Sequence, residues 1–280
     1  MSGTVLVTGC SQGGIGDAVA QEFHQKGYRV FATARKLDKI QHLKDLGLDI
    51  FQLDVTSSSS IEEAVEHIRN ETSGTLDVLV NNSGLGYYRP LLDVDLEEAK
   101  KMFDVNLFGV LAVTQKFAPL LISAKGNIIN IGSIAGRGPW PFQGMYNASK
   151  AALHSMSDAL RVELMPFDVK VTTVVAGFYK TKFFENQIKA DLPESSLYLP
   201  IKSNIDDRMS GKDIEHFSAD PSECARTIVN NLQKAKLWYW CGGSVNIIWF
   251  NTTWLWHTFL DNYCFKTFGL DVLKKKLKLN

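Results

Sequence analysis

The sequence predicts an α/β fold with a doubly wound parallel sheet, and three observations support this class. Residues 5–7 form an apolar, strand-like run that leads through a glycine-rich turn into a helical pattern. Further short, β-branched runs alternate with helical patterns along the chain. The runs are apolar, which is typical of strands that helices cover on both faces. Such sheets bind ligands at the carboxyl ends of their strands.

The remaining elements follow in order along the chain. Further strands are predicted at residues 28–33, 49–53, 76–80, 127–131 and 169–175. Helices are predicted at residues 15–26, 60–71, 95–124 and 147–165. Residues 182–218 are less regular and more polar, and we expect them to form a lid over the substrate.

Length and composition narrow the class of protein. A chain of 280 residues is long enough for one α/β domain. Its 30 basic and 30 acidic residues balance, so the charge does not favour a nucleic-acid partner. The four cysteines lack metal or redox spacing and the six histidines form no cluster, so no metal site is expected. A strand almost at the N-terminus leaves no room for a signal peptide, and we expect a reduced, cytoplasmic protein.

The turn after the first strand has the composition of a phosphate-binding loop. Residues 4–23 read TVLVTGCSQGGIGDAVAQEF, with glycines at Gly9, Gly13, Gly14 and Gly16. Backbone N–H groups at a helix N-terminus bind anions, and the helix dipole adds to the attraction. The spacing matches neither G-x-G-x-x-G nor G-x-x-x-G-x-G, so an ordinary glycine-rich turn stays open as the alternative.

The end of the second predicted strand favours NADP over NAD. An acidic residue at this place hydrogen-bonds the ribose of NAD and repels a 2′-phosphate. Here the strand ends in Ala34, Arg35 and Lys36. A guanidinium binds a phosphate through two parallel hydrogen bonds, so Arg35 indicates NADPH/NADP as the cofactor. The alternative is a solvated basic turn.

Tyr146 and Lys150 form a candidate acid–base pair. They are four residues apart at the start of a predicted helix, so both side chains lie on one face. A phenol is a weak acid, and a nearby ammonium is expected to lower its pKa towards the range that general acid–base catalysis needs. Ser133 follows the strand at 127–131 and should expose its hydroxyl at the same edge of the sheet. A surface pair without a catalytic role is the alternative.

Together these motifs resemble the short-chain dehydrogenase/reductase family over residues 4–181. Residues 8–16 correspond to the cofactor loop of that family, and residues 81–84 (NNSG) correspond to its Asn-Asn-Ala-Gly motif. The resemblance implies a single-domain Rossmann fold with an aromatic C-terminal extension. The catalytic positions that it implies are Asn106, Ser133, Tyr146 and Lys150. The cofactor-binding positions that it implies are Gly9, Ser11, Gly14, Ile15, Arg35, Asp54, Asn82, Gly84, Tyr146, Lys150, Gly177 and Thr181.

The loop departs from the family pattern in two ways. It is longer by one residue within 10–13, where Gly13 is expected to absorb the altered backbone angles. It also lacks the basic residue that some NADP-dependent relatives place before the Gly-Ile-Gly sequence. Arg35 is therefore the expected main ligand of the 2′-phosphate, with Ser11 and Lys36 as helpers.

The resemblance implies a hydride transfer between the nicotinamide and a carbonyl or alcohol carbon. Tyr146 would protonate the developing alkoxide, and Ser133 would hydrogen-bond the substrate oxygen. Lys150 would bind the nicotinamide ribose and lower the pKa of Tyr146, and Asn106 would hold a water that links Lys150 to solvent. Because cytosolic NADP is mostly reduced, reduction of a carbonyl is the expected direction.

Aromatic and apolar segments predict a hydrophobic substrate. The expected lining on the lid side is Phe178, Tyr179, Phe183, Phe184, Leu197 and Tyr198, and the opposite rim is 84–88 and 139–142. Such linings suit a lipid, steroid, polyketide or other secondary-metabolite ketone, and ordinary packing of loops is the alternative. The overall pattern is similar to acyl-dihydroxyacetone-phosphate reductases and hydroxysteroid-type reductases.

The chain is expected to consist of a cofactor-binding and catalytic domain at 1–236 and a last strand with an aromatic extension at 237–280. Residues 237–260 contain no charged side chain and many aromatic ones, and four lysines follow between 274 and 278. We expect this extension to cover the substrate mouth and to touch either a membrane surface or a second subunit of a homo-oligomer. The membrane version would place a cytoplasmic protein at the surface of the endoplasmic reticulum or of lipid droplets.

Two other functions stay open at this point. One is a non-redox cyclisation or isomerisation of a biosynthetic intermediate on the same fold. The other is a catalytically silent NADP-binding protein, which the complete set of four catalytic positions argues against.

Overall fold

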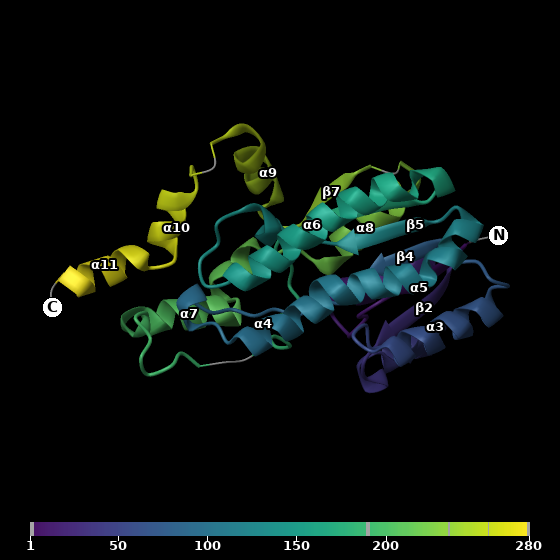
Figure 1. The fold of residues 1–280 in the computed structure, drawn as a ribbon, viewed down its shortest axis with the longest axis horizontal. Coiled ribbons are helices and arrows are strands. Elements are labelled where there is room, and N and C mark those ends of the chain that lie inside the picture. Colours follow the sequence, from purple (N-terminus) through teal and green to yellow (C-terminus); the bar gives the residue numbers. More distant parts are fainter. Residues whose placement is uncertain (1–2, 189–190, 235, 257, 279–280) are drawn as a thin grey trace.

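The computed structural model describes residues 3–188, 191–234, 236–256 and 258–278. Its sheet is parallel, with strand order β3-β2-β1-β4-β5-β6-β7. The strands are β1 (Thr4–Val7), β2 (Arg29–Ala34), β3 (Asp49–Gln52), β4 (Val78–Asn81), β5 (Asn127–Ile131), β6 (Lys170–Ala176) and β7 (Trp238–Cys241). The order reverses between β1 and β4, where such sheets open a ligand crevice. The predicted doubly wound fold is confirmed (Figure 1).

Helices pack on both faces of this sheet. The α-helices of the described residues, including those that lie beyond the sheet, are α1 (Ile15–Gln25), α2 (Gln41–Asp45), α3 (Ser58–Glu71), α4 (Leu96–Phe103), α5 (Gly109–Ala124), α6 (Gly144–Leu164), α7 (Lys202–Ser210), α8 (Pro221–Asn231), α9 (Val245–Trp254), α10 (Asp261–Thr267) and α11 (Leu270–Lys278). Successive strand residues point to opposite faces. Val5 and Val7 therefore join a core with α1 and α8, whereas Leu6 joins a core with α3 and α5. Figure 1 shows α3, α5 and α6 on the near face.

The predicted helix at 95–124 differs most from the structure. It consists of α4, a π-helical turn at Asp104–Phe108, and α5. By length and composition the continuous segment Leu96–Ala124 would suffice to cross a membrane. Val113 and Phe117 are nevertheless buried in the core beside the sheet, so this segment serves as a core helix.

The start of α6 and the presence of α2 also differ from expectation. Helix α6 begins at Gly144, three residues early, because the Gln143 carbonyl accepts from the Asn147 N–H at 2.9 Å. The Gln143 side chain strengthens this start by donating from Nε2 to Asn147 Oδ1 at 2.8 Å. Helix α2 has five residues and is too short to show a helical period in the sequence.

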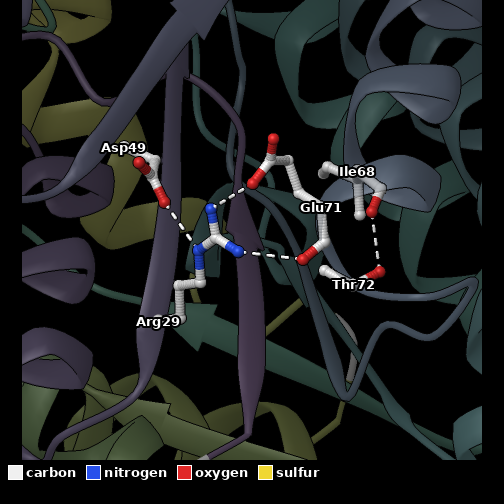
Figure 2. Close-up of polar contacts among 5 residues, drawn as sticks. All are labelled: Arg29, Asp49, Ile68, Glu71 and Thr72. Atoms are coloured by element: carbon white, nitrogen blue, oxygen red, sulfur yellow. Dashed lines mark hydrogen bonds and ion pairs between the residues drawn. The ribbon is translucent and has the colours of Figure 1, made fainter.

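Arg29 joins three elements at the amino edge of the sheet, opposite the ligand crevice. Its Nε donates to Asp49 Oδ2 at 2.8 Å, and its Nη1 and Nη2 donate to the carbonyl and Oε2 of Glu71 at 2.9 and 2.6 Å (Figure 2). The Thr72 hydroxyl donates to the Ile68 carbonyl at 2.7 Å and closes the end of α3. These ion pairs are largely exposed, so solvent and salt screen them and each contributes little to stability.

The last three helices form an arm at the end of the molecule far from the N-terminus (Figure 1). Cys264, Phe268 and Leu273 of the arm are buried in a third apolar core with Phe142 and Ile201. The arm also has an apolar outer surface, which we call the arm surface. Its exposed side chains are Ile247, Trp249, Phe250, Trp254, Trp256, Phe259, Tyr263, Val272 and Leu277.

Candidate active site

A cavity of about 590 Å³ opens at the carboxyl ends of the strands. The sequence-predicted residues in its wall are Gly9, Ser11, Gly14, Ile15, Arg35, Asp54, Asn82, Gly84, Ser133, Tyr146, Lys150, Gly177 and Thr181. Asn106 does not line the cavity; it is fully buried behind the wall. The structure therefore brings together in one cavity all the predicted site residues except Asn106, which lies directly behind them.

The glycine loop begins and ends where the sequence predicts. Gly9 and Gly13 have φ angles of 72° and 80°, so Gly13 takes the left-handed conformation that the longer loop was expected to need. The Gly13 N–H donates to Asp17 Oδ2 at 2.7 Å, which holds the extra residue against the first turn of α1. Gly16 allows close packing, because a β-carbon there would lie 2.6 Å from the Gly9 carbonyl oxygen.

A buried polar network fixes the loop to the centre of the sheet. The Thr8 hydroxyl accepts from the N–H groups of Asn82 and Ser83, both at 3.0 Å. The Asn82 side chain returns two bonds, to the carbonyls of Thr8 and Gly9 at 3.0 and 2.9 Å. These contacts attach the first residues after β4 to the glycine loop.

The end of the cavity that lies next to the glycine loop is basic. Arg35 and Lys36 follow β2 and lie in the cavity wall, as predicted. Lys39 joins them and was not predicted; its carbonyl accepts from the Gln12 N–H at 3.0 Å, which places it over the glycine loop. Asp54, after β3, accepts from the N–H and hydroxyl of Thr56 at 2.9 and 2.7 Å.

Three predicted catalytic residues converge in the middle of the cavity, and the fourth supports them. Tyr146 and Lys150 share one face of α6, and Lys150 Nζ donates to the Ile131 carbonyl at 2.9 Å. The Ser133 hydroxyl hydrogen-bonds Tyr146. Asn106 sits in the π-helical turn, where its Oδ1 accepts from the Leu85 N–H at 2.8 Å and its Nδ2 donates to the Leu85 carbonyl at 2.9 Å.

Comparisons with known proteins decide the family. Residues 3–191 match the short chain dehydrogenase family. The chain is 47% identical over 211 residues to the short-chain dehydrogenase PC-15 of Penicillium crustosum, covering 75% of this chain and 77% of that one. It is 42% identical over 205 residues to the NADPH-dependent 1-acyldihydroxyacetone phosphate reductase of Schizosaccharomyces pombe, covering 72% and 69%.

The chain belongs to the short-chain dehydrogenase/reductase family. A solved short-chain dehydrogenase from Streptomyces avermitilis has the same fold, with a TM-score of 0.76 at 25% identity over 99% of this chain and 95% of that one. The protein is thus an oxidoreductase that acts on a CH–OH or C=O group. Among the described residues, no group of histidine, cysteine or acidic side chains could hold a metal ion.

Burial dominates the acid–base behaviour of the family's tyrosine and lysine. Burial raises the pKa of Tyr146 to about 12, although the hydrogen bond with Ser133 and the charge of Arg208 both lower it. Burial lowers the pKa of Lys150 to about 8. The expected lowering of the Tyr146 pKa by Lys150 is therefore wrong for this structure, because desolvation disfavours the charged forms of both groups.

The substrate end of the cavity is apolar, but its lining differs from the prediction. Phe178, Tyr179, Phe183 and Phe184 line it as expected, together with Leu85, Tyr88, Trp140 and Ile214. Leu197 and Tyr198 were also expected there but lie outside the wall, and Leu197 is 66% exposed. Phe142 also lies outside, because it packs against Tyr198 and Phe268 in the third core.

Two polar residues at this end were not predicted from the sequence. Arg208 of α7 is only 4% exposed, and its Nε and Nη2 donate to Gln143 Oε1 at 3.1 and 2.7 Å. Both residues line the cavity. A single arginine in a polar, irregular stretch gives no sequence signal of burial, so only the packing of α7 shows its place.

Gly177 permits a close chain crossing beside the cavity. Its N–H donates to the Cys241 carbonyl at 2.8 Å, and a β-carbon on it would lie 2.8 Å from Val245 Cγ1. Phe178 and Gly243 exchange two backbone hydrogen bonds of 3.1 Å just beyond it. The segment that leads to Thr181 is thus attached to the chain that follows β7.

Proposed function

We propose that the protein reduces a carbonyl to an alcohol on a hydrophobic substrate, with NADPH as the hydride donor. The observation that carries this proposal is the arrangement of the cavity. Its basic end and its apolar end meet at Ser133, Tyr146 and Lys150. A reaction that joins an anionic cofactor to an apolar ketone needs this order of surfaces.

The residues present fit a phosphorylated dinucleotide. The glycine loop leaves open backbone at the N-terminus of α1, which suits a pyrophosphate. Arg35 would hold the 2′-phosphate, with Lys36 and Ser11 beside it, and Lys39 extends this basic surface. The name of the fission-yeast reductase, which is NADPH-dependent, supports the same preference.

The remaining predicted contacts follow the cavity wall. Asp54 would lie beside the adenine, and Asn82 and Gly84 along the cofactor. Gly177 and Thr181 would face the nicotinamide carboxamide.

Each catalytic side chain then has a defined task. A nicotinamide held in the cavity would supply a hydride to the carbonyl carbon. Tyr146, protonated at neutral pH because of its raised pKa, donates a proton to the substrate oxygen. Ser133 hydrogen-bonds the same oxygen and orients it. Lys150 would bind the ribose. Asn106 holds the backbone of Leu85, next to Gly84, where a β-carbon would lie 3.7 Å from Lys150 Nζ, and it would position the water that restores the proton of Lys150.

The substrate is proposed to be a lipid, steroid, polyketide or other secondary-metabolite ketone. Aromatic rings provide most of the wall at this end, and Tyr88 and Phe183 lie within 6 Å of the Tyr146 ring. Gln143 and Arg208 supply polar groups that would fix the orientation of an otherwise apolar molecule. The name of the fission-yeast reductase, which acts on 1-acyldihydroxyacetone phosphate, is consistent with a lipid ketone.

We further propose a cytoplasmic protein whose arm surface touches an apolar partner. Trp254 and Trp256 are 68% and 67% exposed, which favours contact with a membrane surface such as that of the endoplasmic reticulum or lipid droplets. A homo-oligomer in which the arm packs on a second subunit is the competing arrangement. Among the described residues, none of the arm lines the cavity. The expectation that the extension covers the substrate mouth therefore has no support in the structure.

A substrate panel tests the proposed reaction. Purified protein is mixed with NADPH or NADH and with apolar ketones, small polar ketones or no ketone, and the loss of absorbance of the reduced cofactor is followed. We expect turnover with NADPH and apolar ketones. Conversion of a substrate without consumption of NADPH would instead support the non-redox alternative. NADPH binding without turnover of any carbonyl compound would support the catalytically silent alternative.

A further inference from the structure

We propose that His154 is a positioning residue that fixes the catalytic Ser133 through its backbone. His154 lies on α6, four residues after Lys150 and eight after Tyr146, so the three side chains share one helix face. It does not line the cavity, so any effect on the reaction would pass through the residues that do. This inference rests on the proposed catalytic role of Ser133. It adds His154, two turns beyond Tyr146, to the face of α6 that carries Tyr146 and Lys150.

Helix α6 holds the end of β5 at two points on either side of Gly132. Lys150 Nζ donates to the Ile131 carbonyl at 2.9 Å. The Ser133 N–H donates to His154 Nε2 at 3.2 Å. One contact uses a carbonyl and the other an N–H, so the peptide planes before and after Gly132 are both fixed relative to the helix that carries Tyr146.

The geometry determines the tautomer of the imidazole. A backbone N–H can only donate, so Nε2 must be the acceptor and the ring proton must lie on Nδ1. Burial, with the charges of Arg137 and Lys150, lowers the pKa of His154 to about 3. The ring therefore stays neutral, and able to accept, at any pH at which the protein works.

The surroundings of the ring are shaped to hold it. A β-carbon on Gly132 would lie 2.7 Å from His154 Cδ2, and one on Gly136 would lie 2.9 Å from Cε1. Both glycines thus make room for the imidazole. On its other side the ring meets Trp238 edge-on at 5.0 Å, and the Arg137 guanidinium lies 4.0 Å from the Trp238 ring centroid.

The histidine is costly in terms of folding, which indicates a role beyond packing. It is 4% exposed, and its Nδ1 has no hydrogen-bond partner among the described residues. A buried polar group without a partner opposes folding. An apolar side chain of similar size would avoid this cost but would leave the Ser133 N–H without an acceptor.

The position of Ser133 matters because its hydroxyl has two duties. The oxygen accepts from the Ala135 N–H at 3.0 Å, and the hydroxyl hydrogen-bonds Tyr146 and lowers its pKa. A shift of the Ser133 backbone would therefore move the group that orients the substrate oxygen. It would also weaken the contact that favours the ionised form of Tyr146.

Three substitutions separate the acceptor from the bulk of the side chain. His154→Gln keeps an acceptor at the depth of Nε2, His154→Asn is polar but too short, and His154→Leu fills the space without an acceptor. For the Leu and Asn variants we expect kcat to fall roughly 10- to 100-fold, since small misplacements of reacting groups cost this much, with the Kd of NADPH unchanged. The Gln variant should keep most of the kcat. His67→Leu, on α3 and outside the cavity, is the matched control.

Two measurements distinguish a positioning role of His154 from a general loss of structure. Oxidation of an alcohol needs ionised Tyr146. Because a weaker contact with Ser133 raises the pKa of Tyr146, the acidic limb of the pH profile for oxidation should move to higher pH in the Leu and Asn variants but not in the Gln variant. Hydrogen exchange at the Ser133 amide should accelerate in the same two variants, and this measurement does not depend on any substrate.

The outcomes are distinct. If the Leu variant does not fold, the comparison of Gln with Asn decides. Equal kcat values and equal acidic limbs for Gln and Asn would overturn the proposal. A wild-type protein that turns over no carbonyl compound, but whose Ser133 amide exchange still depends on His154, would refute the proposed function and leave the contact established.

Discussion

The two ends of the cavity are built in different ways. The cofactor end is built on backbone turns after β1, β2 and β4, which are held by Thr8 and Asn82 and brought close by glycines, and the side chains of Arg35, Lys36 and Lys39 make it basic. The substrate end consists of side chains from segments far apart in the sequence, such as Tyr88, Trp140 and Phe183. Backbone contacts require particular residues at particular spacings, whereas an apolar wall accepts many combinations. We therefore expect the first end to determine the family chemistry and the second to determine the choice of substrate.

The proposed catalytic residues lie where the cofactor end and the substrate end of the cavity meet, and we expect their removal to have the largest effect. Tyr146→Phe removes the proton donor and keeps the ring that packs against Tyr88. We expect reduction to fall about 10²- to 10⁴-fold with NADPH binding unchanged. Steady-state rates and a fluorescence titration with NADPH measure both quantities. Tyr198→Phe, outside the cavity, is the control; equal rates for the two variants would remove Tyr146 from the mechanism.

Arg35→Ala tests the cofactor end alone. Loss of a bidentate phosphate contact costs about 1.5–3 kcal/mol, or roughly 10- to 150-fold in affinity. We expect this loss for NADPH and not for NADH, so the preference between the two cofactors should shrink. Arg69→Ala, a surface change on α3, is the control. An equal loss for both cofactors would show that Arg35 supports the fold rather than the 2′-phosphate.

The pH dependence of reduction tests Lys150 and Tyr146, which lie where the two ends of the cavity meet. Burial depresses the pKa of Lys150 to about 8, so the ammonium is present below that pH and is lost as the pH rises through it. Tyr146 stays protonated up to about pH 12. The kcat/KM for reduction should therefore fall above pH 8, by about tenfold per pH unit. A flat profile up to pH 10 would contradict the assignment of this limb to Lys150.

Changes on the arm surface should affect binding to membranes and leave the chemistry intact. Replacing Trp249, Trp254 and Trp256 with Gln should abolish flotation with anionic phospholipid vesicles, with turnover of a water-soluble ketone unchanged. Replacing Leu91 and Leu92, which are 62% and 74% exposed elsewhere, is the matched control.

Sedimentation of the same tryptophan variant separates the two proposed partners. A smaller sedimenting species with flotation unchanged would support the subunit contact instead. Truncation of the arm is less suitable, because Phe268 and Leu273 belong to the third core.

The difference between the ends also explains what the sequence could predict. The strands and the glycine loop were found because apolar runs and glycine spacing are properties of adjacent residues. The sequence does not predict Arg208 and Gln143 in the cavity, because their contact joins α7 to the start of α6 and depends on packing between distant segments. The direction of the Tyr146 pKa was wrong because helical spacing shows which groups are neighbours but not how deeply they are buried.

The π-helical turn at Asp104–Phe108 sets the rotational phase between two lengths of one helix. Before it, Ala99 and Met102 of α4 face the core at the substrate end, and after it, Val113 and Phe117 of α5 face the sheet. A π turn contains one residue more than an α turn, and each residue of a helix turns about 100°. Deleting one residue here would rotate α4 by that angle about the axis of α5. Ala99 and Met102 would then lose their alignment with the third core although every other residue was retained.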